Sequence, residues 1–239
     1  MSVRSLLSIA AAAVSLSAPA YAASLTITSV SGVWQDASIG VSGEGTSKIR
    51  WGKSDGHGKS AYDFDPTETE FVVEEDESFV LGTFTHFNNP IYGPFLSAVD
   101  LALEFTIEGL ADPVSAVFSF SHWETLNSAT PCANGEANYT GVNASGCADR
   151  VTATVNEGLT EVFVIDNIAY SLDVTGFFHR GEMMTEFWTK ERKENSARLT
   201  ASFSAIKSEV PPPVVPLPAP AFLLLGGLGG LAALRRRKG

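Results

Sequence analysis

The chain has 239 residues, of which 16 are basic and 27 acidic, and its formal net charge is −11. Such an acidic chain repels the phosphates of nucleic acids and the headgroups of anionic lipids, which excludes nucleic acid as a partner. Composition also distinguishes the two ends of the chain from a middle segment that is long enough to bury a hydrophobic core.

The N-terminus is organised as a secretory signal peptide. Arg4 supplies a short positive start, and an uncharged apolar run follows from Leu6 to Leu16. Ala20-Tyr21-Ala22 has the small-x-small pattern that signal peptidase cleaves, so we expect residues 1–22 to be removed between Ala22 and Ala23. The apolar run forms a signal helix and not a membrane anchor, because it has about half of the ~20 residues that a bilayer span needs.

The C-terminal segment 210–239 is just as ordered. Pro211-Pro212-Pro213 is a stiff spacer, followed by Val215-Pro216-Leu217-Pro218-Ala219, an apolar stretch from Ala221 to Leu234, and Arg235-Arg236-Arg237-Lys238. As a helix the apolar stretch would be about 21 Å long, short of the ~30 Å hydrocarbon core. The terminal basic cluster keeps the last residues cytoplasmic. We therefore expect a short transmembrane helix that holds the protein in the inner membrane only for a time.

This tail resembles the PEP-CTERM class of sorting signals, and Val215 to Ala219 matches its VPLPA variant. The resemblance implies that an exosortase, a membrane cysteine protease or transpeptidase, recognises the tail and releases the protein or passes it to another anchor. It also implies a Gram-negative host, usually one that makes exopolysaccharide. A plain tail-anchored protein is the alternative.

Removing both ends leaves a strongly acidic domain at residues 23–209. The ends carry five of the 16 basic residues and no acid, so 11 basic and 27 acidic residues remain, a net charge of −16. Cys132 and Cys147 are close in sequence, and in an oxidising compartment we expect them to form a disulfide that closes a loop of about 16 residues and contributes roughly 3 kcal/mol. A zinc site would need two further ligands, which the segment does not offer.

The domain shows the period-2 alternation of strands with one buried face, as in Leu25 to Val30. Turn residues such as Gly43-Glu44-Gly45 and Asp166-Asn167 separate the strands. We predict an all-β fold, a single β-sandwich of jelly-roll or immunoglobulin-like type with about ten short strands. The other predicted strands are Phe79 to Phe87, Leu101 to Ile107, Val114 to Phe120, Val151 to Val155, Glu161 to Ile165, Ile168 to Val174 and Leu199 to Ile206, with weaker ones at Ile39 to Val41, Ser47 to Trp51 and Glu70 to Val73.

One strand end carries polar residues that alternation aims inward. In Thr85-His86-Phe87-Asn88, His86 shares a face with Phe84, and Thr85 and Phe87 take the other. His86 and Asn88 are predicted either to hydrogen-bond across the strand end or to act as ligand or catalytic groups.

The Thr85-His86-x-Asn88 pattern resembles the signature of the THxN family of PEP-CTERM proteins. Further matches extend this resemblance over most of the domain, and they imply a secreted surface protein whose biochemical activity is undetermined. They are Trp51-Gly52, His122-Trp123-Glu124-Thr125-x-Asn127, Gly146-Cys147-Ala148-Asp149-Arg150-Val151 and Glu191-x-x-x-Asn195-Ser196-Ala197.

Two possible ligand sets follow. His122 and Glu124 lie beside the cysteine loop. If the fold brings His86 near them, the three side chains could bind a metal or perform acid–base chemistry. If His57 and His179 instead point elsewhere, purely structural roles for the histidines are favoured. Alternation also aims Asp63 and Asp65 the same way, which suits a weak Ca²⁺ site.

The functional prediction is an exported cell-surface or matrix protein that associates with exopolysaccharide without catalysing a reaction. The sequence has no nucleophile-elbow, phosphate-loop or His-Glu-x-x-His motif. The alternatives are a secreted hydrolase with paired carboxylates and a calcium-dependent adhesin. Trp34, Trp51 and Trp188 are candidate aromatic contacts if they are exposed, and core residues otherwise.

Overall fold

Almost all of the regular structure in this protein is β-strand. The computed structural model describes residues 23–68, 70–154 and 162–206, and within these ranges the one helical element is a 3₁₀ turn, η1 (Gly141–Asn143). The predicted all-β class is therefore confirmed. The signal segment 1–22 and the tail from residue 207 onward lie outside the described residues. Within the described ranges, no helix is both long and apolar enough to cross a bilayer.

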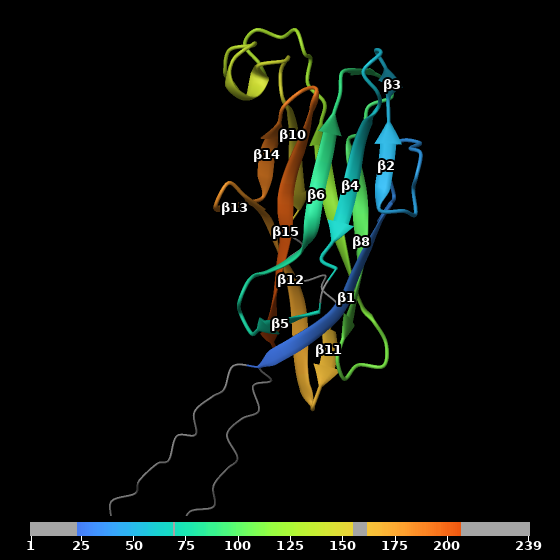
Figure 1. Cartoon of the computed structure of the whole chain (residues 1–239), viewed down its shortest axis with the longest axis vertical. Coiled ribbons are helices and arrows are strands. Elements are labelled where there is room, and N and C mark those ends of the chain that lie inside the picture. The colour runs from blue at the N-terminus through green and yellow to red at the C-terminus, as the bar shows by residue number, and fades with distance from the viewer. Residues whose placement is uncertain (1–22, 69, 155–161, 207–239) are drawn as a thin grey trace, which may run out of the picture. The chain divides into compact units, whose positions relative to one another are not determined.

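The strands form two large antiparallel sheets (Figure 1). The six-stranded sheet has the order β14-β10-β9-β8-β1-β5 and contains β14 (Glu186–Thr189), β10 (Asp149–Thr154), β9 (Val114–Trp123), β8 (Ala98–Ile107), β1 (Ser24–Gln35) and β5 (Phe71–Glu74). The seven-stranded sheet has the order β11-β12-β15-β6-β4-β2, with β13 paired to β12. Its strands are β11 (Val162–Ile165), β12 (Ile168–His179), β15 (Lys193–Ala205), β6 (Phe79–Asn88), β4 (Ser60–Pro66), β2 (Lys48–Trp51) and β13 (Glu182–Met184). A small separate sheet pairs β3 (Lys53–Ser54) with β7 (Ile91–Tyr92).

Both large sheets contribute side chains to one hydrophobic core. Alternate residues of β8 and β9 are buried, as the period-2 pattern predicts, and each fully buried aromatic side chain contributes about 1.5–3 kcal/mol. Across the core, the ring centroids of Trp34 on β1 and Tyr62 on β4 lie 5.4 Å apart. Those of Phe84 on β6 and Phe120 on β9 lie 5.3 Å apart. The inward faces of the two sheets are therefore in direct contact.

The eight strongly predicted strands each correspond to an observed strand, and most observed strands are longer. Of the weaker predictions, Ser47 to Trp51 and Glu70 to Val73 match β2 and β5. The prediction at Ile39 to Val41 is wrong. Residues 39–41 form no strand. The chain there lies next to the start of β8, where the backbone N–H of Ser38 donates to Ala98 O at 2.9 Å, and the neighbouring Ser42 forms an isolated bridge with Arg50.

The sequence did not predict β4, which matters most for the site described below. It alternates from Tyr62 onward, with Tyr62 and Phe64 buried while Asp63 and Asp65 face outward. Aspartate is disfavoured in strands, and the two acids suggested a cation site instead. Pairing of β4 with both β2 and β6 outweighs that preference.

Candidate functional site

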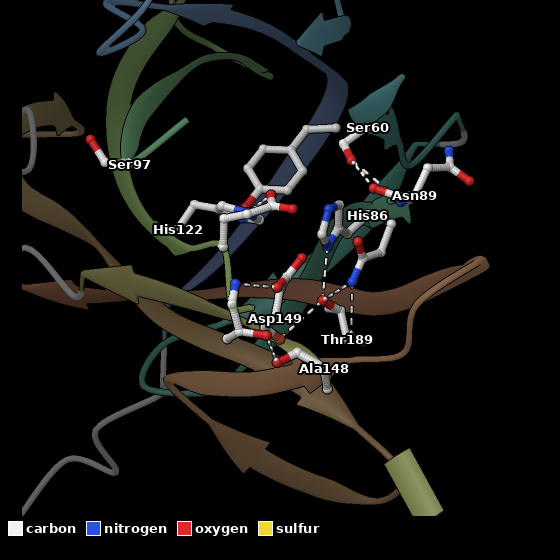
Figure 2. Close-up of polar contacts among 12 residues, drawn as sticks. Ser60, His86, Asn89, Ser97, His122, Ala148, Asp149 and Thr189 are labelled. Atoms are coloured by element: carbon white, nitrogen blue, oxygen red, sulfur yellow. Dashed lines mark hydrogen bonds and ion pairs between the residues drawn. The ribbon is translucent and has the colours of Figure 1, made fainter. Parts of the chain in front are cut away.

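One end of the core is polar instead of apolar. Strands β4, β6, β9, β10 and the turn after β14 place ionisable and hydroxyl side chains where the sheets would otherwise be filled by hydrocarbon (Figure 2). Burying such groups is costly unless each finds a hydrogen-bond or charge partner. The groups in question are Tyr62, His86, Asn88, His122, Asp149, Thr189 and Glu191, all of them buried.

His122 links two of these groups. It points inward from β9, where its Nδ1 lies 2.6 Å from Tyr62 Oη and its Nε2 lies 3.3 Å from Glu124 Oε2. Burial lowers the pKa of His122 to about 4, and burial also raises the pKa of the Tyr62 phenol. Both groups are therefore neutral near pH 7. The imidazole then has one N–H and one lone pair, and the Tyr62 hydroxyl can pair with Nδ1 in either tautomer, because it can donate or accept.

His86 takes part in a second, directional chain. The Thr189 hydroxyl donates to Asp149 O at 3.0 Å, so it must accept the hydrogen of His86 Nδ1, which lies 2.9 Å away. Asn88 Nδ2 donates to Thr189 O at 3.0 Å. The lone pair of His86 consequently lies on Nε2, which is buried without a partner, as is the indole N–H of the stacked Trp51 ring.

Three carboxyl groups accumulate beside His122. Asp149 Oδ1 accepts the backbone N–H of Thr125 at 2.7 Å, but Asp149 Oδ2 is buried with no hydrogen-bond partner. The buried Glu191 oxygens make no well-aligned hydrogen bond either, although the Asn127 side chain is close enough to lower the Glu191 pKa. Burial raises the pKa of Glu124 to about 8. Burial, reinforced by the charge of Glu124, raises the pKa of Asp149 well above its ordinary value and that of Glu191 to about 7. Among the described residues no lysine or arginine comes within ion-pair distance of any of them.

Within the described residues, one group of metal-binding side chains meets the geometric requirement for a shared ion. The ligand atoms of His122, Glu124 and Asp149 all lie within 4.8 Å of one another. Glu191 is close enough for its charge to raise the pKa of Asp149. A cavity of about 470 Å³ adjoins this group, and Glu124 forms part of its wall. The other lining residues are Asp55, Pro90, Ile91, Tyr92, Phe95, Thr125, Leu126 and Asn127.

The disulfide loop closes the polar end. Cys132 and Cys147 are bonded as predicted, and no described cysteine is free. Asn143, which is fully buried, accepts the backbone N–H of Ala148 at 2.9 Å, next to Asp149. Gly146 has φ +124°, and a Cβ there would lie 2.7 Å from Asn127 Oδ1, so only glycine lets the loop approach Asn127. The loop thereby positions Asp149 and Asn127 together.

The sequence predictions for this site have different outcomes. His86 and His122 do converge, with ring centroids 5.1 Å apart, and Glu124 lies beside His122. By contrast, His57 is exposed, and His179 forms a hydrogen bond with Ser196 O away from the site. Thr85 lies on the outer face of β6, where its hydroxyl pairs with Ser196 Oγ at 2.9 Å. The side chains that carry the THxN resemblance thus gather largely at one end of the core.

The other candidates lie elsewhere. Asp63 and Asp65 share a face as predicted, but the Asp63 carboxylate is 2.8 Å from Lys48 Nζ and takes no part in a group of three metal-binding side chains within the described residues. Trp34 and Trp51 are core residues, while Trp188 is partly exposed. Sequence reasoning missed Tyr62 and Thr189 altogether and gave Asp149 and Glu191 no chemical role.

A search with models of protein families and a search of curated proteins both returned no match for the sequence. The resemblance to the THxN family and to PEP-CTERM sorting tails accordingly stays a prediction, supported by the motifs themselves.

Proposed function

We propose that this protein is an exported cell-surface or extracellular-matrix module of a Gram-negative bacterium, which an exosortase sorts and which contacts exopolysaccharide without catalysing a reaction. Signal peptidase would remove residues 1–22, and the VPLPA tail would hold the protein in the inner membrane until exosortase acts. The proposal includes a β-sandwich architecture, which rests on the aromatic contacts between the two sheets, such as Trp34 with Tyr62.

The disulfide is the structural feature that favours export. Cys132 and Cys147 are bonded with Cα atoms 5.3 Å apart, and structural disulfides persist mainly in oxidising compartments. The bond closes a loop that is also held by backbone hydrogen bonds and by asparagine side chains, as when Asn138 Nδ2 donates to Asn127 O at 2.8 Å. A domain whose polar end depends on such a bond suits the periplasm or the cell surface.

The sorting step has a direct test. Mass spectrometry of the mature protein, isolated from cells with and without the exosortase, should find a chain that begins at Ala23 in both cases and lacks the basic tail only when the enzyme is present. A chain that keeps Arg235-Arg236-Arg237-Lys238 in both strains would contradict exosortase sorting and leave export intact.

An aromatic ladder on the outer face of the six-stranded sheet carries the proposed polysaccharide contact. Arg150 on β10 is the direct cross-strand neighbour of both Trp123 on β9 and Trp188 on β14. Its guanidinium lies 4.9 Å from the Trp123 ring centroid and 5.9 Å from that of Trp188. Trp123 is 46% exposed, although a sheet surface normally carries polar groups. Flat, exposed rings flanked by a hydrogen-bond donor suit the apolar face and hydroxyls of a sugar.

The contact is tested by affinity electrophoresis in gels that contain exopolysaccharide purified from the producing cells. Trp123→Ala should abolish the retardation, and Tyr139→Ala should not, because Tyr139 is more exposed, at 72%, but lies on the disulfide loop away from the ladder. Equal retardation of both variants and the parent would contradict this surface as the binding site.

The alternative of a polysaccharide hydrolase has less support. Such enzymes hold two carboxyl groups about 5–10 Å apart on either side of an open substrate cleft. Glu124 and Asp149 are nearer to each other than that, and Asp149 is fully buried. The calcium-dependent adhesin is likewise disfavoured, because Lys48 already neutralises Asp63.

A further inference from the structure

The polar end of the core has an imbalance of charge that protein groups alone do not resolve. Asp149 and Glu191 are fully buried and the Glu124 side chain is largely buried beside them, while Arg192 acts on Glu191 only at a distance. An isolated buried carboxylate is unstable by many kcal/mol unless it is paired, protonated or bound to a metal. Three such groups beside a neutral imidazole require either shared protons or a cation.

We propose that His122, Glu124 and Asp149 bind one divalent transition-metal ion, with Zn²⁺ as the best fit. The inference goes beyond the proposed surface function and does not depend on the sorting tail or on polysaccharide binding. The chemistry of the donors favours this class, because imidazole nitrogen suits Zn²⁺ and its neighbours, whereas Ca²⁺ is bound by oxygen ligands alone.

Hydrogen bonds orient two of the donors as a metal ligand needs. The Tyr62 hydroxyl at 2.6 Å can accept the hydrogen of His122 Nδ1, which leaves the Nε2 lone pair directed at Glu124 and available to an ion. This is the outer-shell hydrogen bond that metal-binding histidines commonly make. Thr125 N–H fixes Asp149 Oδ1, and Asp149 Oδ2 stays buried and unpaired. One oxygen is thus oriented and the other is free to bind.

Glu191 adds a further buried carboxyl group beside these donors. It is fully buried, and neither carboxylate oxygen makes a well-aligned hydrogen bond, although the Asn127 side chain is close enough to lower its pKa. It lies in the turn after β14, distant in sequence from His122 and Asp149, yet its charge raises the pKa of Asp149, and the charge of Glu124 raises its own. Glu191 lies outside the group of ligand atoms that meet within 4.8 Å, so its charge adds to the need for a cation without coordinating it.

The surrounding fold holds the donors and gives an ion a way in. β9 and β10 are paired with His122 opposite Val151, which sets the inward His122 side chain and Asp149 at the same end of neighbouring strands. The disulfide loop covers this end and positions Asp149 through Thr125, whose hydroxyl donates to Ala148 O at 3.1 Å. Glu124 is the donor that borders the 470 Å³ cavity, and an ion would enter along it.

The test uses the whole chain, expressed with export so that the disulfide forms, and isolated in mild detergent. After dialysis against a chelator, the protein is titrated with Zn²⁺, Mn²⁺ and Ca²⁺ separately by calorimetry and thermal unfolding. We expect one Zn²⁺ per chain and, at a free concentration a hundredfold above Kd, a rise in Tm of about 5–10 °C. Ca²⁺ should bind at least tenfold more weakly. No saturable Zn²⁺ or Mn²⁺ site, or a site filled preferentially by Ca²⁺, would overturn the proposal.

A matched histidine variant serves as the control for Zn²⁺ bound at the protein surface. His57 lies 3.0 Å from Asp55 on the surface and could bind Zn²⁺ adventitiously. His57→Asn should leave the stoichiometry and the Tm rise unchanged. If His57→Asn abolished both, the ion would belong to the surface pair and the buried site would be refuted.

Variants of the groups around the ligands complete the test without depending on a fragile fold. Glu191→Gln removes a buried charge and keeps the side-chain shape, so the metal-free variant should fold at least as stably as the parent while Zn²⁺ affinity falls at least tenfold. Tyr62→Phe should weaken Zn²⁺ binding by about 10–100-fold through His122. If Glu191→Gln folds and binds Zn²⁺ as the parent does, the charge of Glu191 takes no part in holding the ion, and the proposed charge balance is wrong.

Discussion

The two ends of the core use the same pair of sheets in opposite ways. At the end near the described N-terminus, Leu25, Tyr170 and Phe203 pack as hydrocarbon and aromatic rings, with the Tyr170 and Phe203 centroids 5.7 Å apart. At the end beneath the disulfide loop, the buried side chains include His86 and Asp149 instead (Figure 2). Strand alternation determines only which side chains face inward, so it permits both kinds of interior.

The two ends are therefore stabilised by different kinds of interaction. The apolar end is stabilised by burial, which is non-directional and tolerates repacking. The polar end depends on a directional chain in which His86 donates to Thr189 and Thr189 donates to Asp149 O. Loss of one member leaves the next unsatisfied, and such networks are sensitive to single changes.

The largest effect is expected at the apolar end. Phe203→Ala should lower the free energy of unfolding by about 3–5 kcal/mol, because the ring is fully buried and its removal leaves a cavity. Urea unfolding measures the change, and Phe203→Leu is the milder control. Zn²⁺ stoichiometry of the folded fraction should not change. A loss of metal binding in Phe203→Ala would show that the two ends are coupled instead of separate.

Removing the disulfide should have the next largest effect. The bond joins residues 15 apart in the sequence, and replacing both Cys132 and Cys147 by serine should lower the free energy of unfolding by roughly 3 kcal/mol. Unlike Phe203→Ala, this change should also weaken Zn²⁺ binding, since the loop positions Asp149. Urea unfolding and calorimetry on the same sample test both parts, with reduced parent protein as control. Undiminished affinity would mean that strand pairing alone orients the ligands.

A pair of threonine variants isolates the directional chain. Thr189→Val keeps the shape of a fully buried side chain but leaves His86 Nδ1 and Asp149 O unpaired, so unfolding should become easier by about 1–3 kcal/mol in chelator. Thr85→Val removes an exposed hydroxyl pair with Ser196 and should change stability by less than about 0.5 kcal/mol. Equal effects in urea unfolding would remove the distinction between the buried network and surface hydrogen bonds.

The local sequence pattern predicted much of the fold but only part of the candidate site. Alternation placed His86 inward and Thr85 outward correctly, and the spacing of Cys132 and Cys147 predicted their disulfide, because each inference needs only neighbouring residues. Asp149 joins His122 only through the pairing of β9 with β10, and Glu191 enters from the turn after β14. No periodicity encodes that convergence, because strand order and register arise from contacts between distant segments.

Tyr62 shows a second reason for failure. Its strand reads Ser60-Ala61-Tyr62-Asp63-Phe64-Asp65, and the acids drew the interpretation toward a cation site on the outward face. The functional side chain lies on the opposite face, where Tyr62 orients His122. Charged residues on an exposed face say little about the buried face of the same strand, and here the inward aromatic was the more informative residue.

The smallest effect concerns that outward face. Asp63→Asn breaks the 2.8 Å ion pair with Lys48, but both side chains are about 30% exposed and Lys48 also lies over the Phe87 ring, 3.9 Å from its centroid. Solvent screens such a pair, so urea unfolding should show a loss of less than about 1 kcal/mol. Added Ca²⁺ should leave the Tm of parent and variant equally unchanged. A Ca²⁺-dependent rise in Tm that Asp63→Asn abolishes would instead place a cation site on β4 and reverse the assignment of roles to its two faces.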